Sequence, residues 1–102
     1  MSNAKKKMPR KTTRIDLKEE YEGYFIIFRT NPKIRIIESL GDGELSKVLD
    51  ALSEIIVEWN LTDEDGNDLG DVTEESMREV PSDLIEIISK HFMESVAQLS
   101  PK

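Results

Sequence analysis

The sequence contains no cysteine. This absence excludes disulfide bonds, zinc–thiolate sites and thiol nucleophiles, and it suits a reducing compartment. Histidine is scarce as well, because His91 is the only one in the chain. A serine triad would therefore rest on His91 alone, and the nucleophile motif Gly-x-Ser-x-Gly is missing. We expect a protein without enzymatic activity and without a cofactor.

Long apolar segments are also missing. The longest apolar run extends from Tyr24 to Phe28, whereas a membrane-spanning helix needs about 20 apolar residues. The basic N-terminus is not followed by an apolar segment, so it does not resemble a secretory signal. Residues 1–4, Met-Ser-Asn-Ala, resemble a remnant of an expression vector. We expect a cytoplasmic protein that does not enter membranes.

Charge is distributed unevenly along the chain. No acidic residue precedes Asp16, and the segment before it holds six basic residues: Lys5, Lys6, Lys7, Arg10, Lys11 and Arg14. The rest of the chain has 8 basic and 21 acidic side chains, a net charge of −13. Such an acidic body repels nucleic acid phosphates, so we expect no nucleic acid partner.

The same asymmetry indicates how the chain is organised. Residues 1–13 lack apolar periodicity and predict a disordered basic arm. The arm could also contact nucleic acid or another anionic surface, or fold back on the acidic body. Residues 14–102 have the length of a single small domain, and the hydrophobic content of 37% predicts a thin core.

The N-terminal part of this domain predicts a β-hairpin over residues 13–29. Ile15 and Leu17 alternate with polar residues, and the segment from Tyr24 to Arg29 is aromatic and β-branched. Asn31 and Pro32 are typical of a helix start, which predicts a helix ending near Gly41. A third strand over residues 33–38 is the alternative.

The C-terminal part predicts helices. The clearest is an amphipathic helix over residues 44–59, with a stripe formed by Leu45, Val48, Leu49, Leu52, Ile55, Ile56 and Trp59. Thr73 can cap a short helix over residues 74–79, and Ser82 or Asp83 can cap a last helix over about residues 83–99. We therefore expect a mostly helical α+β fold, with an N-terminal β-hairpin packed on three to four helices.

An acidic loop between these helices allows a calcium interpretation. Its four candidate oxygen ligands occupy positions 1, 3, 5 and 12 of a calcium loop: Asp63, Asp65, Asn67 and Glu74. The glycine that such a loop requires at position 6 is instead Gly66, at position 4. The dipeptide Asp65-Gly66 is typical of a simple turn, so the sequence favours a turn. Calcium that raises the melting temperature, reversed by a chelator, would favour the metal site.

Four segments of the chain resemble the tail assembly chaperones of siphophages and prophages, which are small proteins encoded beside the tape measure gene. In chain order the segments are Tyr21-Glu22-Gly23, Phe28-Arg29-Thr30-Asn31-Pro32, Val57-Glu58-Trp59-Asn60-Leu61-Thr62-Asp63-Glu64-Asp65-Gly66 and Val80-Pro81-Ser82-Asp83-Leu84-Ile85. The resemblance spans roughly residues 13–99. The lysine-rich start and the proline-free stretch after Gly66 depart from the family pattern.

The resemblance implies a non-enzymatic role in the cytoplasm of a bacterial host. Such chaperones bind the long, aggregation-prone tape measure protein, and tail tube subunits assemble around that complex. The tape measure protein is then the expected partner, the tail tube protein a possible second one, and a homo-oligomer is possible. A structural virion component, such as a tail-completion or head–tail connector protein, is the alternative.

A chaperone for such a client needs apolar surface and enough charge to stay soluble. The two amphipathic helices could supply the apolar surface. The candidate partner-binding residues are Leu45, Val48, Leu52, Ile56, Trp59, Leu84, Ile88 and Phe92. Some of these must form the core, because a chain this lean has few other apolar side chains to bury.

Overall fold

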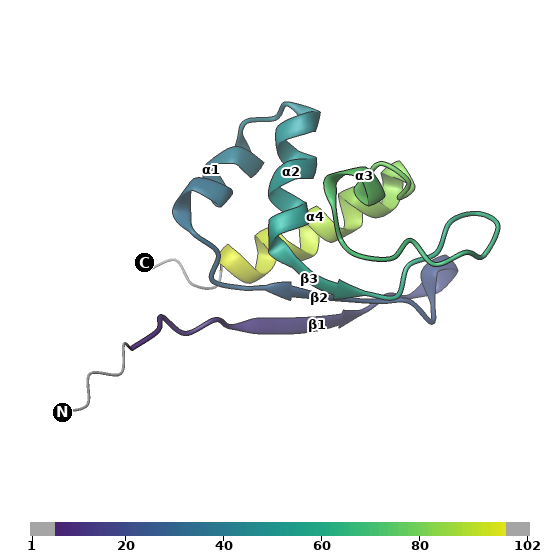
Figure 1. Ribbon diagram of the computed structural model, residues 1–102, viewed down its shortest axis with the longest axis horizontal. Helices are drawn as coiled ribbons and strands as arrows, with labels where there is room; N and C mark the ends of the chain where they lie inside the picture. The colour runs from purple at the N-terminus through teal and green to yellow at the C-terminus, as the bar shows by residue number, and fades with distance from the viewer. Residues whose placement is uncertain (1–5, 98–102) are drawn as a thin grey trace.

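The computed structural model describes the backbone of residues 6–97 and the side chains of residues 6–95. This part of the chain has an α+β fold, as predicted (Figure 1). The elements in chain order are β1 (Thr12–Asp16), the 3-10 helix η1 (Glu19–Tyr21), β2 (Phe25–Arg29), α1 (Ile34–Gly41), α2 (Leu45–Ile55), β3 (Ile56–Trp59), α3 (Glu74–Met77) and α4 (Ser82–Ala97).

The three strands form one antiparallel sheet with β2 in the centre. The predicted hairpin is confirmed, with Ile15 opposite Ile26. On the other side of β2, Ile26 lies opposite Trp59. The register then shifts, which leaves Val57 without a partner residue on β2. The extra residue is a β-bulge, which interrupts the pairing of the short strand β3 with β2.

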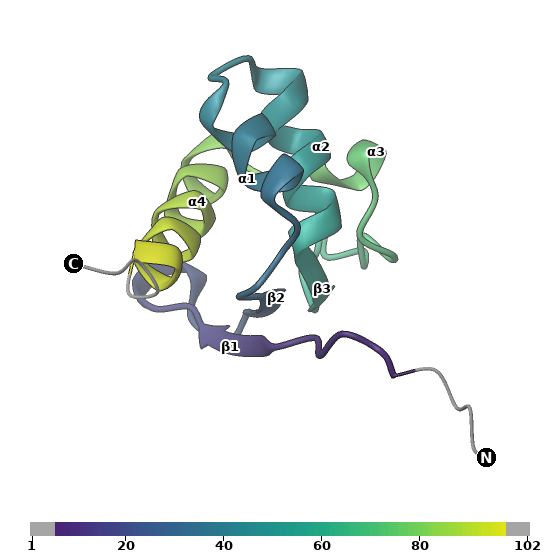
Figure 2. The ribbon, with the colours of Figure 1, turned by 90° about the vertical axis from the view of Figure 1, so that its left-hand side faces the viewer.

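All four α-helices lie on the same side of the sheet, as Figures 1 and 2 show. Side chains that alternate along β2 therefore have different surroundings. Ile26 and Phe28 are buried, whereas Phe25, Ile27 and Arg29 are only partly covered. The ring of Phe28 meets that of Phe92 from α4 edge to face, with 5.8 Å between ring centroids. The inner face of β2 is thus the floor of the core.

No helix of residues 6–97 lies over the opposite face of the sheet (Figures 1 and 2). The guanidinium of Arg14 lies 4.2 Å from the ring centroid of Phe25, and it also pairs with Asp16 at 3.0 Å. The long side chain of Arg14 therefore shields this aromatic ring while its charge stays in water. Over residues 6–97, no helix combines the length and the apolar character that a bilayer crossing requires.

The predicted helix over residues 44–59 is wrong in its last turn. Helix α2 ends at Ile55, and Ile56–Trp59 form β3. Both structures bury Ile56 and Trp59, so the apolar spacing fits either one. The β-branched run Ile55-Ile56-Val57 disfavours a helix. Pairing with β3 also satisfies backbone groups at the edge of β2, which would have no partners if residues 56–59 continued the helix.

Two asparagines bond distant parts of the chain, and one of them differs from the prediction. The side chain of Asn60 accepts from the backbone N of Phe25 at 2.8 Å and donates to the carbonyl of Gly23 at 3.1 Å. Asn31 does not cap α1, which begins two residues after Pro32 and has Lys33 at its N-cap without a side-chain bond. Asn31 instead bonds the segment that precedes β1.

Other predicted elements are confirmed. Residues 34–41 form a helix rather than a third strand. Thr73 caps α3 in a capping box with Ser76, although α3 ends at Met77 rather than at residue 79. The last helix is present but begins at Ser82, so Ser82 and Asp83 lie in its first turn and do not precede it as caps. The predicted end of that helix, at residue 99, lies outside the described residues. The expected arm boundary at residue 13 falls inside β1, because pairing with Phe28 and Arg29 includes Thr12 and Thr13 in the strand.

The contact between Phe28 and Phe92 generates a stability prediction. Phe92 is fully buried, so Phe92→Ala should lower the free energy of unfolding by about 3–5 kcal/mol through lost burial and cavity formation. The matched control is Met93→Ala, because Met93 is 48% exposed on the same helix; its cost should stay below about 1 kcal/mol. Urea unfolding measures both. Equal costs for the two variants would contradict the described core.

Candidate functional site

Three of the four segments that carry the family resemblance meet at one hollow, although they are far apart in the sequence. The hollow has a volume of about 290 Å³ and lies between the β1–β2 connection, the loop over residues 60–72 and the start of α4. We call it the acidic hollow. Its apolar lining consists of Tyr24, Leu61, Leu69, Val80, Pro81 and Leu84.

The polar lining of the acidic hollow carries one sign of charge. Four acidic residues contribute to it: Glu20, Asp63, Glu64 and Glu79. Among residues 6–95, no lysine, arginine or histidine lines the hollow, and none of the four acids takes part in an ion pair. Clustered like charge beside low-dielectric walls concentrates a negative potential. The hollow is therefore suited to an apolar group flanked by cations.

Two tyrosines connect the walls of the acidic hollow. The hydroxyl groups of Tyr24 and Thr62 are 2.8 Å apart and share a hydrogen bond. The hydroxyl of Tyr21 donates to the carboxylate of Asp83 at 2.7 Å. These bonds join the β1–β2 connection to the acidic loop and to the first turn of α4. The shape of the hollow thus depends on contacts between all three segments.

The acidic loop is built around Asp63. Its Oδ1 atom accepts from the backbone N of Asp65 at 2.8 Å and of Asn67 at 2.9 Å. Its backbone N donates to the carbonyl of Asn67 at 2.8 Å. Gly66 has a φ of 87°, a conformation that favours glycine. The predicted turn is confirmed, and Asp63 holds it closed.

Trp59 fixes the other end of the loop. Its indole Nε1 donates to the carbonyl of Gly70 at 2.9 Å, while its ring is buried beside the sheet. A bridge between Thr62 and Asp68 closes the loop in the middle. An irregular acidic segment is thereby held as a defined wall of the hollow.

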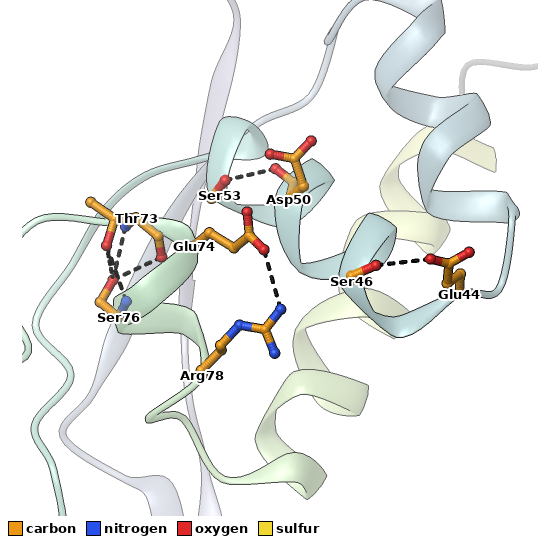
Figure 3. Close-up of polar contacts among 8 residues, drawn as sticks. All are labelled: Glu44, Ser46, Asp50, Ser53, Thr73, Glu74, Ser76 and Arg78. Carbon is orange, nitrogen blue, oxygen red and sulfur yellow. Dashed lines mark hydrogen bonds and ion pairs between the residues drawn. The ribbon is translucent and has the colours of Figure 1, made fainter.

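The calcium ligand set is not assembled in the described residues. Glu74 pairs instead with Arg78, the residue that follows α3, at 3.2 Å (Figure 3). Asp63 already uses its oxygens on the amides of its own loop. Over the chain from residue 6 to residue 95, no three acidic or histidine side chains are placed to hold a metal ion.

Most of the candidate partner-binding residues lie in the core. Leu52, Ile56, Trp59, Leu84, Ile88 and Phe92 are buried. A partner cannot reach them in this conformation, apart from the edge of Leu84 that lines the acidic hollow. Val48 is half-buried against the core, and Leu45 is 62% exposed. The sequence predicted that some of these residues form the core, and the structure buries six of the eight.

Leu45 belongs to a second apolar surface. Together with Leu49, Met77 and Ile85 it lines a shallow groove between α2, α3 and the start of α4. Helical periodicity placed Leu45 on the buried stripe, but it is the first residue of α2 and lies beyond the packed part of the helix. Apart from Leu84 and Asp63, the residues of the acidic hollow were not among the predicted site residues, although the resemblance segments contain most of them.

Comparison with protein-family models, with curated proteins and with solved structures finds no match to this chain.

The bond between Tyr21 and Asp83 generates a pH prediction. This hydrogen bond, together with burial and the charges of Asp83 and Glu20, raises the pKa of Tyr21 from 10.0 to about 12. The neutral phenol is the favoured form, so the stability from this bond is present below pH 10 and is lost between pH 10 and about 12. In a Tyr24→Phe chain, Tyr21 is the only tyrosine, and ultraviolet titration of the folded chain should give a pKa of about 12.

The control for this titration is Asp83→Asn, which removes the charge and keeps a side chain of similar size. It should bring the pKa of Tyr21 back toward 10.0. A pKa near 10 with Asp83 intact would contradict the contact.

The turn around Asp63 generates a prediction at acid pH. Hydrogen bonds from the backbone of Asn67 and Asp65 hold the pKa of Asp63 below its usual 3.8. Stability from the ionised carboxylate is therefore present above pH 3.8 and is lost as the pH falls through the lower folded-state pKa. Asp63→Ala should speed amide exchange at Asp65 and Asn67 at neutral pH, with a difference from the natural chain that shrinks in acid. Equal exchange rates at neutral pH would show that the carboxylate does not hold the turn.

Proposed function

We propose that this chain is a non-enzymatic assembly chaperone of phage tails that binds the tape measure protein. The observation that supports the proposal best is the convergence of three resemblance segments on the acidic hollow. Segments that merely shaped the core could lie anywhere in the fold. Here residues from all three line a surface hollow with an apolar floor and an acidic rim.

The chemistry of the acidic hollow suits a client segment in which an apolar side chain lies between lysines or arginines. The apolar side chain would lose water against Tyr24, Leu61 and Leu69, which favours binding. The flanking cations would meet Glu20, Glu64 and Glu79, which favours fast encounter and excludes acidic segments. The client site therefore differs from the buried stripe that helical periodicity predicted.

The charge of the chain supports the solubilising part of this role. The net charge is −7, and the acids are mostly exposed. A complex that carries this charge repels its own copies and resists precipitation. The bacterial host cytoplasm is the site of action in this proposal, and the tail tube protein is a later partner that assembles around the client.

The test is co-expression with the tape measure protein of the same genome, followed by pull-down. The natural chain should keep the client soluble and co-purify with it. The double variant Glu64→Lys/Glu79→Lys should weaken client binding by about tenfold or more, because it removes the charge complementarity of the rim. The matched control Glu38→Lys/Asp50→Lys changes the net charge equally at exposed helix positions outside the hollow and should bind like the natural chain.

A folded natural chain that leaves the client insoluble and unbound would overturn the chaperone proposal. Incorporation of the chain into purified virions would favour a structural component, since a chaperone leaves before the particle is complete. Equal losses in the hollow variant and the control variant would show that net charge, rather than the hollow, governs binding.

A further inference from the structure

The described part of the basic arm has the features that fit the acidic hollow. Residues 6–11 are exposed along their whole length. Met8 is 88% exposed, more than any other large apolar side chain in the described part of the chain. Four cations surround it in the sequence: Lys6, Lys7, Arg10 and Lys11. The arm thus offers an apolar side chain between cations, complementary to the apolar floor and acidic rim of the hollow.

Asn31 holds the base of this arm at one end of the sheet. Its side chain accepts from the backbone N of Lys11 at 3.0 Å and donates to the carbonyl of Pro9 at 3.1 Å. The backbone N of Thr30 donates to the carbonyl of Lys11 at 2.8 Å. These bonds continue the β1–β2 pairing beyond Thr12. Pro9 is therefore held beside the C-terminal end of β2.

The acidic hollow lies at the other end of β2. Tyr24, which lines the hollow, directly precedes the strand, and Asn31 follows its last residue by two positions. Five strand residues separate the two ends by about 17 Å, whereas one residue spans at most about 3.6 Å. Met8, next to the anchored Pro9, cannot reach the hollow of its own chain. Figure 1 shows the arm and the acidic loop at opposite ends of the sheet.

We propose that the basic arm of one copy binds the acidic hollow of a second copy, with Met8 on the apolar floor and the flanking cations on the rim. The charges on both sides are available, because neither the four arm cations nor the rim acids take part in the ion pairs found among residues 6–95. Each copy has one arm and one hollow, so copies associate head to tail into a ring or an open chain. The inference concerns this chain alone and holds whatever client the hollow also binds.

Site-specific photo-cross-linking tests the contact directly. A photoreactive amino acid replaces Met8, and equal amounts of ¹⁴N-labelled and ¹⁵N-labelled chains are mixed before irradiation. Mass spectrometry should find cross-links from position 8 to residues 61–69 or 79–84, in pairs that combine both isotopes. Cross-links within a single isotope only, or to other parts of the fold, would overturn the proposal.

Sedimentation velocity with two variants tests the head-to-tail arrangement. Met8→Asp disables the arm, Glu64→Lys/Glu79→Lys disables the hollow, and each variant alone should be a monomer. A mixture of the two restores one intact arm and one intact hollow, so it should form dimers and nothing larger. Met93→Asp, at another exposed methionine, should associate like the natural chain.

Salt dependence completes the test. Because exposed charges carry much of the contact, raising the salt from 50 to 500 mM should weaken self-association at least about tenfold. A natural chain that stays monomeric at millimolar concentration and low salt would overturn the proposal, and so would equal effects of Met8→Asp and Met93→Asp. Loss of self-association in Met8→Asp with unchanged client capture would separate this contact from the client contact.

Discussion

Burial of the inner face of β2 under the helices is the interaction on which the rest of the structure depends. β2 is the central strand, and Ile26 and Phe28 supply the floor on which α2 and α4 pack. The chain is lean in apolar residues, so it covers one face of the sheet and leaves the other to charged side chains such as Arg14. A small core of this kind uses almost every regularly spaced apolar residue. Surfaces for partners must therefore come from loops and strand ends.

The two ends of β2 have contrasting chemistry for this reason. At its start the hairpin connection, the acidic loop and α4 surround an apolar hollow with an acidic rim. At its end Asn31 anchors a basic arm that carries an exposed methionine. The length of the strand keeps the hollow and the arm apart within one chain. The proposed client contact and the proposed contact between copies both follow from this separation, because each brings a cationic, partly apolar segment to the hollow from outside.

Much of the fold could be predicted from local patterns. Alternation and aromatic content located the hairpin, and the Asn31-Pro32 signal with Gly41 located α1. Apolar spacing located α2, and the polar residues Thr73, Ser82 and Asp83 located the starts of α3 and α4. The third strand could not be predicted, because Ile56 and Trp59 satisfy a helical stripe and a buried strand equally well. The β-branched run from Ile55 to Val57 disfavours a helix only slightly, and the unpaired edge of β2, a non-local feature, decides between the two. The roles of Asn31 and Asn60 could not be predicted for the same reason. Each bonds a segment at least 20 residues away, and capping rules consider only neighbours in the sequence.

The site was harder to predict than the fold. Periodicity selects residues that face one direction, and in this chain that direction is the core, so Leu52, Ile88 and Phe92 were candidates for a surface that they do not form. The composition of the acidic loop suggested a metal site. In the structure the loop, which includes Leu69, forms a wall of the hollow beside Tyr24. Convergence of distant segments is visible only after folding.

Hydrogen–deuterium exchange on the complex with the tape measure protein tests the central claim most directly. The account predicts that the client slows exchange in the three segments around the acidic hollow: residues 20–24, 61–69 and 79–84. Exchange of the backbone amides in β1, a strand whose outer face no described helix covers, should stay unchanged. Protection confined to the start of α2 near Leu45, or to the uncovered sheet face, would contradict the assignment of the hollow as the binding site.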